Sequence, residues 1–444
     1  MEDKNPESLD KIRQQFDTAP YPRNPIEQSP QDEPNFLFIH NLVTPYYLTN
    51  RKIPEIEGKV ILDAGCGTGY ATLALAMANP GAMIVGTDIS DISLTTARKR
   101  LEYHGYKNVN FYTSSIEDLP QLGLEFDYIN CDEVLYLLPD PISGLKAMKS
   151  VLKPEGIIRT NLHSLLYRHS FYQAQEVFQI MGIRDEQPQS FAIELVRETM
   201  RALNDYAYIK AKTWSGDCET EEEPILLNYL LQGDKGYTIP ELFSSLKEAD
   251  LEFVSMVQWQ QWQLLNVFQD AKQLPSFWKQ RFPHLSIPDK LHFVELINPM
   301  HRLLDFWCVH LGQAKPFVPV DQWDLSHWEN ASVHLHPQLR VPMVRENLIN
   351  CITNQKPFEV SRYLTAPTQI PVTIESDMAS CLLSLWKGVQ PMKLLVEHWL
   401  KIRPLDPVTL ETVSEHTAFS QIKQLLIHLE KFLYVLLERE STEN

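Results

Sequence analysis

Three closely spaced glycines directly after a short apolar run constrain the fold of this chain more than any other feature. The apolar run 60–62 predicts a buried parallel strand, and Gly65, Gly67 and Gly69 follow it at every second position. An alanine- and leucine-rich helical pattern covers residues 71–78. A strand, a glycine turn and a helix in this order direct backbone N–H groups and a helix N-terminus at a bound polar or anionic group. The motif therefore predicts a ligand site on an α/β fold.

Two aspartates indicate the kind of ligand. Asp88 ends a second apolar strand nineteen residues after Gly69, where a carboxylate can accept both hydroxyls of a ribose. Asp63 stands two residues before the first glycine, where a negative charge would oppose a pyrophosphate but would suit an ammonium group. Tyr70 also occupies the place of the third glycine of the dinucleotide fingerprint. S-adenosylmethionine, with its ribose, amino-acid end and sulfonium, fits this pattern.

The sequence Asp-x-Gly-x-Gly-x-Gly resembles the first motif of the class I S-adenosylmethionine-dependent methyltransferases. The resemblance covers roughly residues 15–310, and its specific motifs lie within 60–162. It implies a doubly wound, Rossmann-like α/β sheet. It also implies that one set of residues binds S-adenosylmethionine: Asp63, Gly65, Gly67, Gly69 and Asp88. The alternative is a glycine turn that serves only tight packing of the strand against the helix.

The polar, proline-bearing segment 1–35 precedes the predicted sheet. Its proline-dense part cannot form a regular helix or a central strand, yet it carries aromatic side chains. Related bacterial methyltransferases carry a Tyr/Phe-x-x-x-Pro-Tyr-Pro-Arg sequence at this point, which matches the residues from Phe16 to Arg23. The resemblance thus implies an ordered lid whose Phe16 and Tyr21 close over the cofactor. A linker lying on the surface is the alternative.

The loop after the third predicted strand is expected to contact the adenine ring. In the family this loop usually carries an acid at the place of Ser115, and that acid is missing here. The adenine contacts are therefore expected from the backbone of Ile116 and Glu117, or from Asp118.

Polar residues that follow the fourth and fifth predicted strands are candidates for the chemistry. Asn130 follows the strand 126–129 and is a predicted cofactor-binding residue, because ligands bind beyond the carboxyl ends of such strands. Asp132 and Glu133 come next and can orient a methyl acceptor or take its proton. The alternative is that one acid caps the next helix while the other is solvated. His163, expected just past the end of the fifth strand, is either a further catalytic residue or a structural histidine.

Composition shifts divide the chain into domains. A methyltransferase domain is predicted over residues 36–312, with a mostly helical insertion at 165–236 that is expected to build the substrate pocket. Residues 323–444 form a second, mainly helical domain in this interpretation, closed by an amphipathic helix over Gln421–Glu438. A winged-helix-like arrangement is one hypothesis for this domain. Its expected role is a protein contact or self-association.

Charge and composition argue against several classes of function. The formal net charge of −17 argues against a large nucleic-acid footprint, which needs clustered lysine and arginine. Six scattered cysteines without a Cys-x-x-Cys pair are typical of reduced thiols in the cytoplasm. No signal peptide and no membrane span are expected. His334 and His336 form a strand-like pair with little weight as metal ligands, so no metal site is predicted.

The sequence leaves the methyl acceptor open between several hypotheses. The long insertion and the acidic second domain favour a protein side chain, and an amide nitrogen is one such acceptor. The chain is also similar to cyanobacterial methyltransferases, a group that includes enzymes acting on an asparagine of phycobiliproteins. A small-molecule acceptor is the first alternative. The second is a regulatory protein that binds the cofactor without turnover.

Overall fold

The computed structural model describes residues 6–186, 189–314, 316–365 and 370–439. Within these ranges the chain forms an eight-stranded sheet of order β3-β2-β1-β4-β5-β8-β7, with β6 paired to β5. The strands are β1 Val60–Ala64, β2 Met83–Asp88, β3 Val109–Thr113, β4 Phe126–Cys131, β5 Leu152–Ser164, β6 Gly236–Tyr237, β7 Leu251–Met256 and β8 Leu303–His310. The strands β1 to β5 are parallel, and β8 runs antiparallel to both β5 and β7.

Helices cover both faces of this sheet because successive strand residues point to opposite sides. Leu62 of β1 belongs to a core built with α6 and α13, whereas its neighbour Ile61 belongs to a second core built with α4 and α5. The helices are α2 Pro34–Ile39, α3 Val43–Asn50, α4 Tyr70–Ala78, α5 Asp91–Tyr103, α6 Pro141–Ser150, α13 Ile239–Glu248, α14 Ser276–Arg281 and α15 Ile287–Ile297. This architecture confirms the doubly wound, Rossmann-like sheet.

β5 is longer than the sequence predicts. The apolar run suggests a strand that ends near residue 160, with His163 beyond it, but β5 continues to Ser164. The pairing His163↔Leu303 with β8 and His163↔Gly236 with β6 supplies backbone partners on both sides. The polar residues at 161 and 163 interrupt the apolar run, so the sequence does not indicate that the strand continues. His163 therefore lies within the sheet rather than past its edge.

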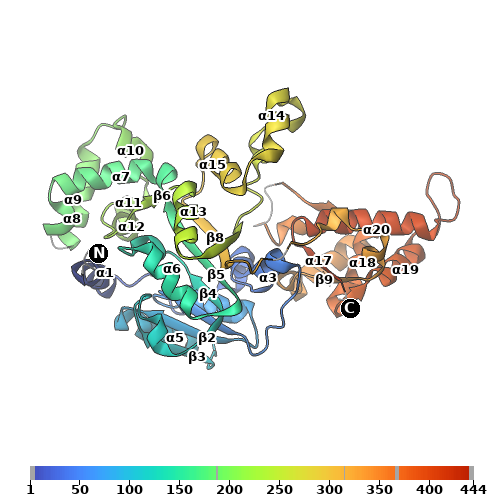
Figure 1. Cartoon of the computed structure of the whole chain (residues 1–444), viewed down its shortest axis with the longest axis horizontal. Coiled ribbons are helices and arrows are strands. Elements are labelled where there is room, and N and C mark those ends of the chain that lie inside the picture. Colours follow the sequence, from blue (N-terminus) through green and yellow to red (C-terminus); the bar gives the residue numbers. More distant parts are fainter. Residues whose placement is uncertain (1–5, 187–188, 315, 366–369, 440–444) are drawn as a thin grey trace.

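A helical insertion separates β5 from β6. It comprises α7 Leu165–Ile180, α8 Ile183–Glu186, α9 Gln189–Ala202, α10 Tyr208–Thr213, α11 Asp217–Thr220 and α12 Glu223–Asn228. Its helices share a small core of their own, with Phe178, Met200 and Tyr229 at its centre. Figure 1 shows the insertion at one end of the molecule, beside α1 Pro6–Thr18, with the C-terminal region at the other end. The expected helical insertion is confirmed.

The C-terminal region is mainly helical and carries a small three-stranded sheet of order β12-β9-β13. Its elements are α16 Leu325–Glu329, β9 Ala331–Leu335, α17 Pro342–Thr353, β10 Phe358–Glu359, β11 Thr373–Ile374, α18 Ser376–Leu382, β12 Gln390–Pro391, α19 Met392–Ile402, α20 Glu415–Glu430 and β13 Val435–Arg439. Its core also includes Phe38, Val43 and Tyr47 of α2 and α3. Within the described ranges, no helix is long and apolar enough to cross a membrane.

The prediction of one closing helix over Gln421–Glu438 is wrong at its C-terminal half. The helix α20 ends at Glu430, and Leu433 then adopts the left-handed conformation with φ of 56°. The chain reverses there and pairs β13 antiparallel to β9. The apolar residues 432, 433 and 436 keep a helical spacing, but three consecutive buried residues from Val435 to Leu437 suit a strand that is covered on both faces.

Candidate active site

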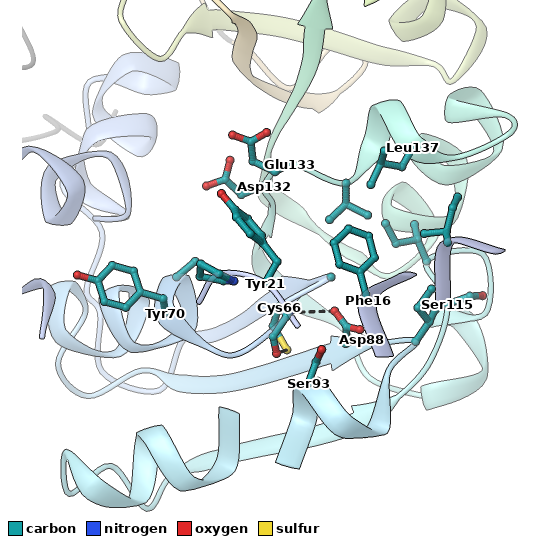
Figure 2. Close-up of a pocket in the computed structure, with 18 of the residues that line it drawn as sticks. Phe16, Tyr21, Cys66, Tyr70, Asp88, Ser93, Ser115, Asp132, Glu133 and Leu137 are labelled. Carbon is teal, nitrogen blue, oxygen red and sulfur yellow. Dashed lines mark hydrogen bonds between the residues drawn. The ribbon is translucent and has the colours of Figure 1, made fainter. Parts of the chain in front are cut away.

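A cavity of about 300 Å³ opens at the carboxyl edge of the sheet, a volume within the roughly 300–1,000 Å³ of small-molecule sites. Figure 2 shows that Phe16 and Tyr21 project into it between Asp88 on one side and Asp132 with Glu133 on the other. Eight of the residues predicted from the sequence line the cavity: Tyr21, Gly65, Gly67, Asp88, Ile116, Glu117, Asp132 and Glu133. Asp63, Gly69, Asn130 and His163 do not line it.

The glycine turn lets other parts of the chain approach its backbone closely. Gly65 has φ of 76°, and a Cβ there would overlap Val134. Gly67 has φ of 52°, and a Cβ there would lie less than 3.0 Å from the carbonyl oxygen of Tyr21. Gly69 has φ of 81° and lies against Ala97 of α5. The first two glycines therefore shape the cavity and its cover, while Gly69 allows α4 and α5 to pack.

Asp88 presents its carboxylate to the cavity from the end of β2. Its oxygens accept hydrogen bonds from the backbone N–H of Gly67 at 2.9 Å and of Ser90 at 2.8 Å, the first of them drawn in Figure 2. Burial raises the pKa of Asp88, against the lowering effect of these backbone donors. Each carboxylate oxygen has two lone pairs, so acceptor capacity is left for hydroxyl groups of a ligand.

The N-terminal segment is fixed over the cavity by backbone contacts. The Tyr21 carbonyl accepts a hydrogen bond from Thr68 N–H at 3.0 Å, and the Thr68 hydroxyl donates to Pro22 O at 2.6 Å. Arg100 of α5 donates to Asn24 O and Pro25 O, each at 2.7 Å. The sequence points to the aromatic side chains of this segment but not to Thr68 and Arg100, because these bonds go to backbone carbonyls and carry no residue signature.

Asp63 and Asn130 lie behind the glycine turn, buried in the sheet. The Asp63 carboxylate accepts from the Thr72 hydroxyl at 2.6 Å and from the Asn130 amide at 2.8 Å. Asn130 Oδ1 in turn accepts from Arg159 Nη1 at 2.9 Å. Burial raises the pKa of Asp63 to about 6, although the bonds from Thr72 and Asn130 oppose this effect. In this arrangement the two residues support the turn from behind.

The loop after β3 contains a buried hydrogen-bond acceptor that has no partner. Among the described residues, Glu117 Oε2 is buried and has no hydrogen-bond partner. Such an acceptor is free to receive a hydrogen bond from a ligand. Ser115 donates to Asp118 Oδ2 at 2.8 Å, and Asp118 lies outside the cavity lining. The ring-edge amino group of an adenosine cofactor is a donor of the required kind, so the residues present fit the group.

Asp132 belongs to a buried ionic network that crosses the sheet. Its carboxylate lies 3.3 Å from Arg159 Nη1 and accepts from Asn161 Nδ2 at 2.5 Å. Arg159 also pairs with Asp305 of β8 at 2.8 Å and donates to His40 Nε2 at 3.2 Å. The sequence does hold a signal for this pair, since Arg159 follows two isoleucines and the oppositely charged Asp305 lies between a leucine and a phenylalanine.

Glu133 lies between the cavity and a second cavity of about 340 Å³. It has φ of 62°, an uncommon left-handed conformation for a side-chain-bearing residue. Its carboxylate forms an ion pair with Arg302 and accepts from the Tyr136 hydroxyl at 2.8 Å. Burial favours the neutral acid, but the contacts with His163 and Arg302 hold the pKa of Glu133 well below its usual range. Phe16, Tyr21, Glu133 and Leu137 line both cavities.

His163 faces the second cavity. Its Nδ1 lies 2.7 Å from Asp234 Oδ1, and its ring stacks on Tyr136 with centroids 3.7 Å apart. Asp234 and Arg302, which the sequence does not indicate, reach His163 because β6 and β8 flank the end of β5. These pairings join residues far apart in the sequence.

Comparison with known proteins connects this geometry to one family. The family model described as a methyltransferase domain matches residues 56–245. A Neisseria meningitidis protein, named ubiquinone biosynthesis O-methyltransferase, is 30% identical over 36% of this chain and 69% of its own length. Its Actinobacillus pleuropneumoniae namesake is 37% identical over 28% of this chain, and that match spans 56% of the relative.

An uncharacterized protein of Synechococcus sp. is 28% identical over 70% of this chain and 72% of its own length. Among solved structures, PKMT2 from Rickettsia typhi shares the fold with a TM-score of 0.58 at 15% identity, over 91% of this chain and 77% of that one. The chain therefore belongs to the class I S-adenosylmethionine-dependent methyltransferases, is an enzyme of that family, and uses S-adenosylmethionine as its cofactor.

Proposed function

We propose that this enzyme methylates a protein side chain that enters the second cavity and meets the cofactor at Tyr21 and Glu133. One observation carries the proposal: the two cavities share four lining residues, so an acceptor in one lies directly beside a ligand in the other. The cytoplasm remains the expected compartment. In this proposal residues 1–35 act as a lid, and residues 36–312 and 323–444 are separate domains.

The first cavity would hold S-adenosylmethionine, which supplies an electrophilic methyl carbon on its sulfonium. Asp88 would accept the ribose hydroxyls, and the turn from Gly65 to Gly69 would place its backbone against the ligand. Ile116 and Glu117 would contact the adenine, with Glu117 Oε2 as acceptor. Phe16 and Tyr21 would cover the site and exclude water. Asp63 and Asn130 would act on the cofactor through the shape of the turn that they support.

Alignment of the acceptor with the methyl carbon would supply much of the rate, since well-oriented systems gain about 7–11 kcal/mol. Asp132 is engaged by Arg159, and Glu133 by Arg302, so each carboxylate is better suited to orient an acceptor than to take a proton. His163 has a ring nitrogen facing the second cavity. Arg302 Nη1 also lies 3.0 Å from this nitrogen, but a neutral imidazole keeps an acceptor lone pair there, so of the three predicted catalytic residues His163 is the one that suits a base.

The surface of the insertion supports a protein acceptor. Residues of the second cavity come from the insertion, among them Pro224, Leu227 and Asn228. Large apolar side chains are exposed on the same insertion, including Tyr206 at 85%, Ile180 at 74% and Met181 at 69%. Exposed apolar groups of this kind favour contact with another protein.

A small-molecule acceptor is the alternative, and the relatives named ubiquinone biosynthesis O-methyltransferases favour it. Those matches cover 28–36% of this chain, so most of the chain lies outside them. In the C-terminal region, Val408 and Leu410 are exposed at 87% and 71%, which supports a protein contact or self-association there.

Transfer of a tritiated methyl group tests the acceptor class. The enzyme is incubated with tritium-methyl S-adenosylmethionine and lysate, and the protein, nucleic-acid and small-molecule fractions are counted separately. Label in a protein band that disappears with Asp88→Ala supports the proposal. Label confined to small molecules would replace it with the alternative.

A further inference from the structure

The two ring nitrogens of His163 have different surroundings. On one side, Nδ1 lies 2.7 Å from Asp234 Oδ1, inside the fold. On the other side, Nε2 faces the second cavity, where Arg302 Nη1 lies at 3.0 Å and Glu133 Oε2 at 3.7 Å. The ring itself is 1% exposed and is held against Tyr136. The histidine is thus buried and enclosed by contacts, with one nitrogen toward the protein and one toward the proposed acceptor.

Asp234 is held by donors of the insertion and has no exposed side-chain surface. Its Oδ2 accepts from Arg168 Nη2 at 2.9 Å and from Gln175 Nε2 at 2.8 Å. Its Oδ1 lies 3.4 Å from the Tyr172 hydroxyl in addition to His163. Burial opposes ionisation, but the bonds from His163 and Arg168 lower the pKa of Asp234 to about 2. A carboxylate with this set of donors is ionised and can only accept.

The two neighbours together determine the tautomer of His163. Ionised Asp234 has no proton to give, so Nδ1 must carry the hydrogen that bridges to it. Arg302 has donors and no acceptor, so Nε2 must present its lone pair. The hydrogen bond made by one ring nitrogen fixes the state of the other. A neutral imidazole with its lone pair toward the acceptor site is the form that a general base requires.

We propose that Asp234 is the positioning residue that holds His163 as the base of methyl transfer, and that Arg302 covers the base until an acceptor displaces it. The inference rests on the proposed function of the second cavity. The acceptor gives its proton to His163 Nε2, and its lone pair forms the new bond to the methyl carbon. The C–S bond breaks, and its electron pair stays on sulfur as the neutral thioether. His163 is left protonated, and its proton passes to solvent.

Charged groups from each neighbouring element bear on this step. Two carboxylates face the ring, Glu133 after β4 and Asp234 before β6, and one cation faces it, Arg302 before β8. Arg168 of α7 acts one contact further away, through Asp234. Arg302 is 42% exposed and also pairs with Glu133, so it can turn toward the carboxylate when an acceptor takes its place. Tyr136 and Tyr172 complete the surroundings as hydroxyl donors.

Asp234→Asn tests this arrangement because it should reverse the tautomer of His163, while Arg168 and Gln175 still find an acceptor at position 234. Arg168 and Gln175 both donate toward one oxygen position, so the single amide oxygen of the variant is drawn there. The amide NH₂ then faces His163 Nδ1, which must accept. Nε2 must then carry the hydrogen, with Arg302 donating to Glu133 alone, and it can no longer receive a proton. Asp205→Asn, a 96% exposed aspartate paired with Lys210, is the matched control.

Nitrogen-15 NMR of the histidine side chains in the full chain measures the tautomer of His163 directly. His163→Gln assigns the ring signals by their loss. We expect a protonated Nδ1 and an unprotonated Nε2 in the wild type and in Asp205→Asn, and the reverse in Asp234→Asn. A wild-type ring protonated on Nε2 alone, or an unchanged ring in Asp234→Asn, would overturn the proposal.

Label transfer gives the second readout. Asp234→Asn should lose at least tenfold in turnover, while its cofactor affinity by calorimetry stays within about twofold of wild type. General acid–base groups typically contribute 10²–10⁴-fold, which bounds the loss expected for His163→Gln. Full turnover in Asp234→Asn would also overturn the proposal. Absence of transfer by the wild type would instead count against the proposed function, and the ring signals would still decide the tautomer.

Discussion

Gly67→Ala tests whether the glycine turn serves the cover of the site as well as the cofactor. Gly67 has φ of 52°, and an added Cβ would lie less than 3.0 Å from the Tyr21 carbonyl oxygen. The left-handed conformation costs a side-chain-bearing residue roughly 1–2 kcal/mol. The Tyr21 carbonyl must also move, which disrupts its bond from Thr68 N–H and the adjoining bond from the Thr68 hydroxyl to Pro22. At about 0.5–1.5 kcal/mol each, these bonds bring the expected loss of stability to roughly 2–5 kcal/mol.

Gly58→Ala separates the two contributions. Gly58 has φ of 76°, and a Cβ there would meet no atom within 4 Å. This variant therefore carries the backbone cost alone, roughly 1–2 kcal/mol. The difference between the two variants measures the contact between the turn and the N-terminal segment.

Denaturant unfolding and calorimetric titration with S-adenosylmethionine measure the two effects. Because the docked cover of Gly67→Ala is destabilised by about 1–3 kcal/mol, its cofactor affinity should fall by a factor of about 5–150 at most. Gly58→Ala should bind within about twofold of wild type. Equal stability and equal cofactor affinity of Gly67→Ala and Gly58→Ala would refute a contact between the glycine turn and the N-terminal segment.

Three further variants test the ribose contact, the buried Asp63 and the contact between α3 and the C-terminal region. Asp88→Ala should bind S-adenosylmethionine at least about tenfold more weakly in the same titration, because hydrogen bonds to a charged group contribute about 1.5–3 kcal/mol. Unchanged affinity would contradict the assignment of Asp88 to the ribose. Burial raises the pKa of Asp63 from 3.8 to about 6, so the folded chain holds a proton there that the unfolded chain releases. Relative to Asp63→Asn, wild-type stability should thus fall by about 3 kcal/mol as the pH rises from about 4 to 6, and parallel stability curves would contradict this. Tyr47→Phe should cost about 1–3 kcal/mol in thermal unfolding, since Leu437 N–H donates to the Tyr47 hydroxyl at 3.1 Å where α3 meets the C-terminal region; an unchanged melting temperature would exclude this contribution.

The sequence predicted those features that can be recognised from a pattern of neighbouring residues. The apolar strands before Gly65 and Asp88 and the glycine turn between them need only neighbouring residues to be recognised. The doubly wound order of the sheet followed from their family resemblance, and the structure confirms it. The cavity also brings together eight of the twelve predicted site residues, because the ends of parallel strands meet at one edge.

The features that the sequence missed depend on distant partners. His163 lies inside β5 because β6 and β8 pair with it. Asp234 and Arg302, which precede those strands and are 71 and 139 residues away, supply its surroundings. A pattern around His163 alone cannot show this. The closing helix was extended too far for the same reason, since β9 provides the strand pairing that ends the helical period after Glu430.

In the proposed reaction, a protein side chain reaches the cofactor through the second cavity. Leu227 lines that cavity and not the first, so Leu227→Trp should fill the acceptor space and leave the cofactor space intact. The decisive measurement is tritium transfer to the protein fraction by wild type, Leu227→Trp and Asp88→Ala, alongside calorimetric cofactor binding and a melting curve for each. We expect protein label with the wild type and none with either variant, while Leu227→Trp still folds and binds S-adenosylmethionine. Undiminished protein label with Leu227→Trp, or wild-type label confined to small molecules, would contradict the claim.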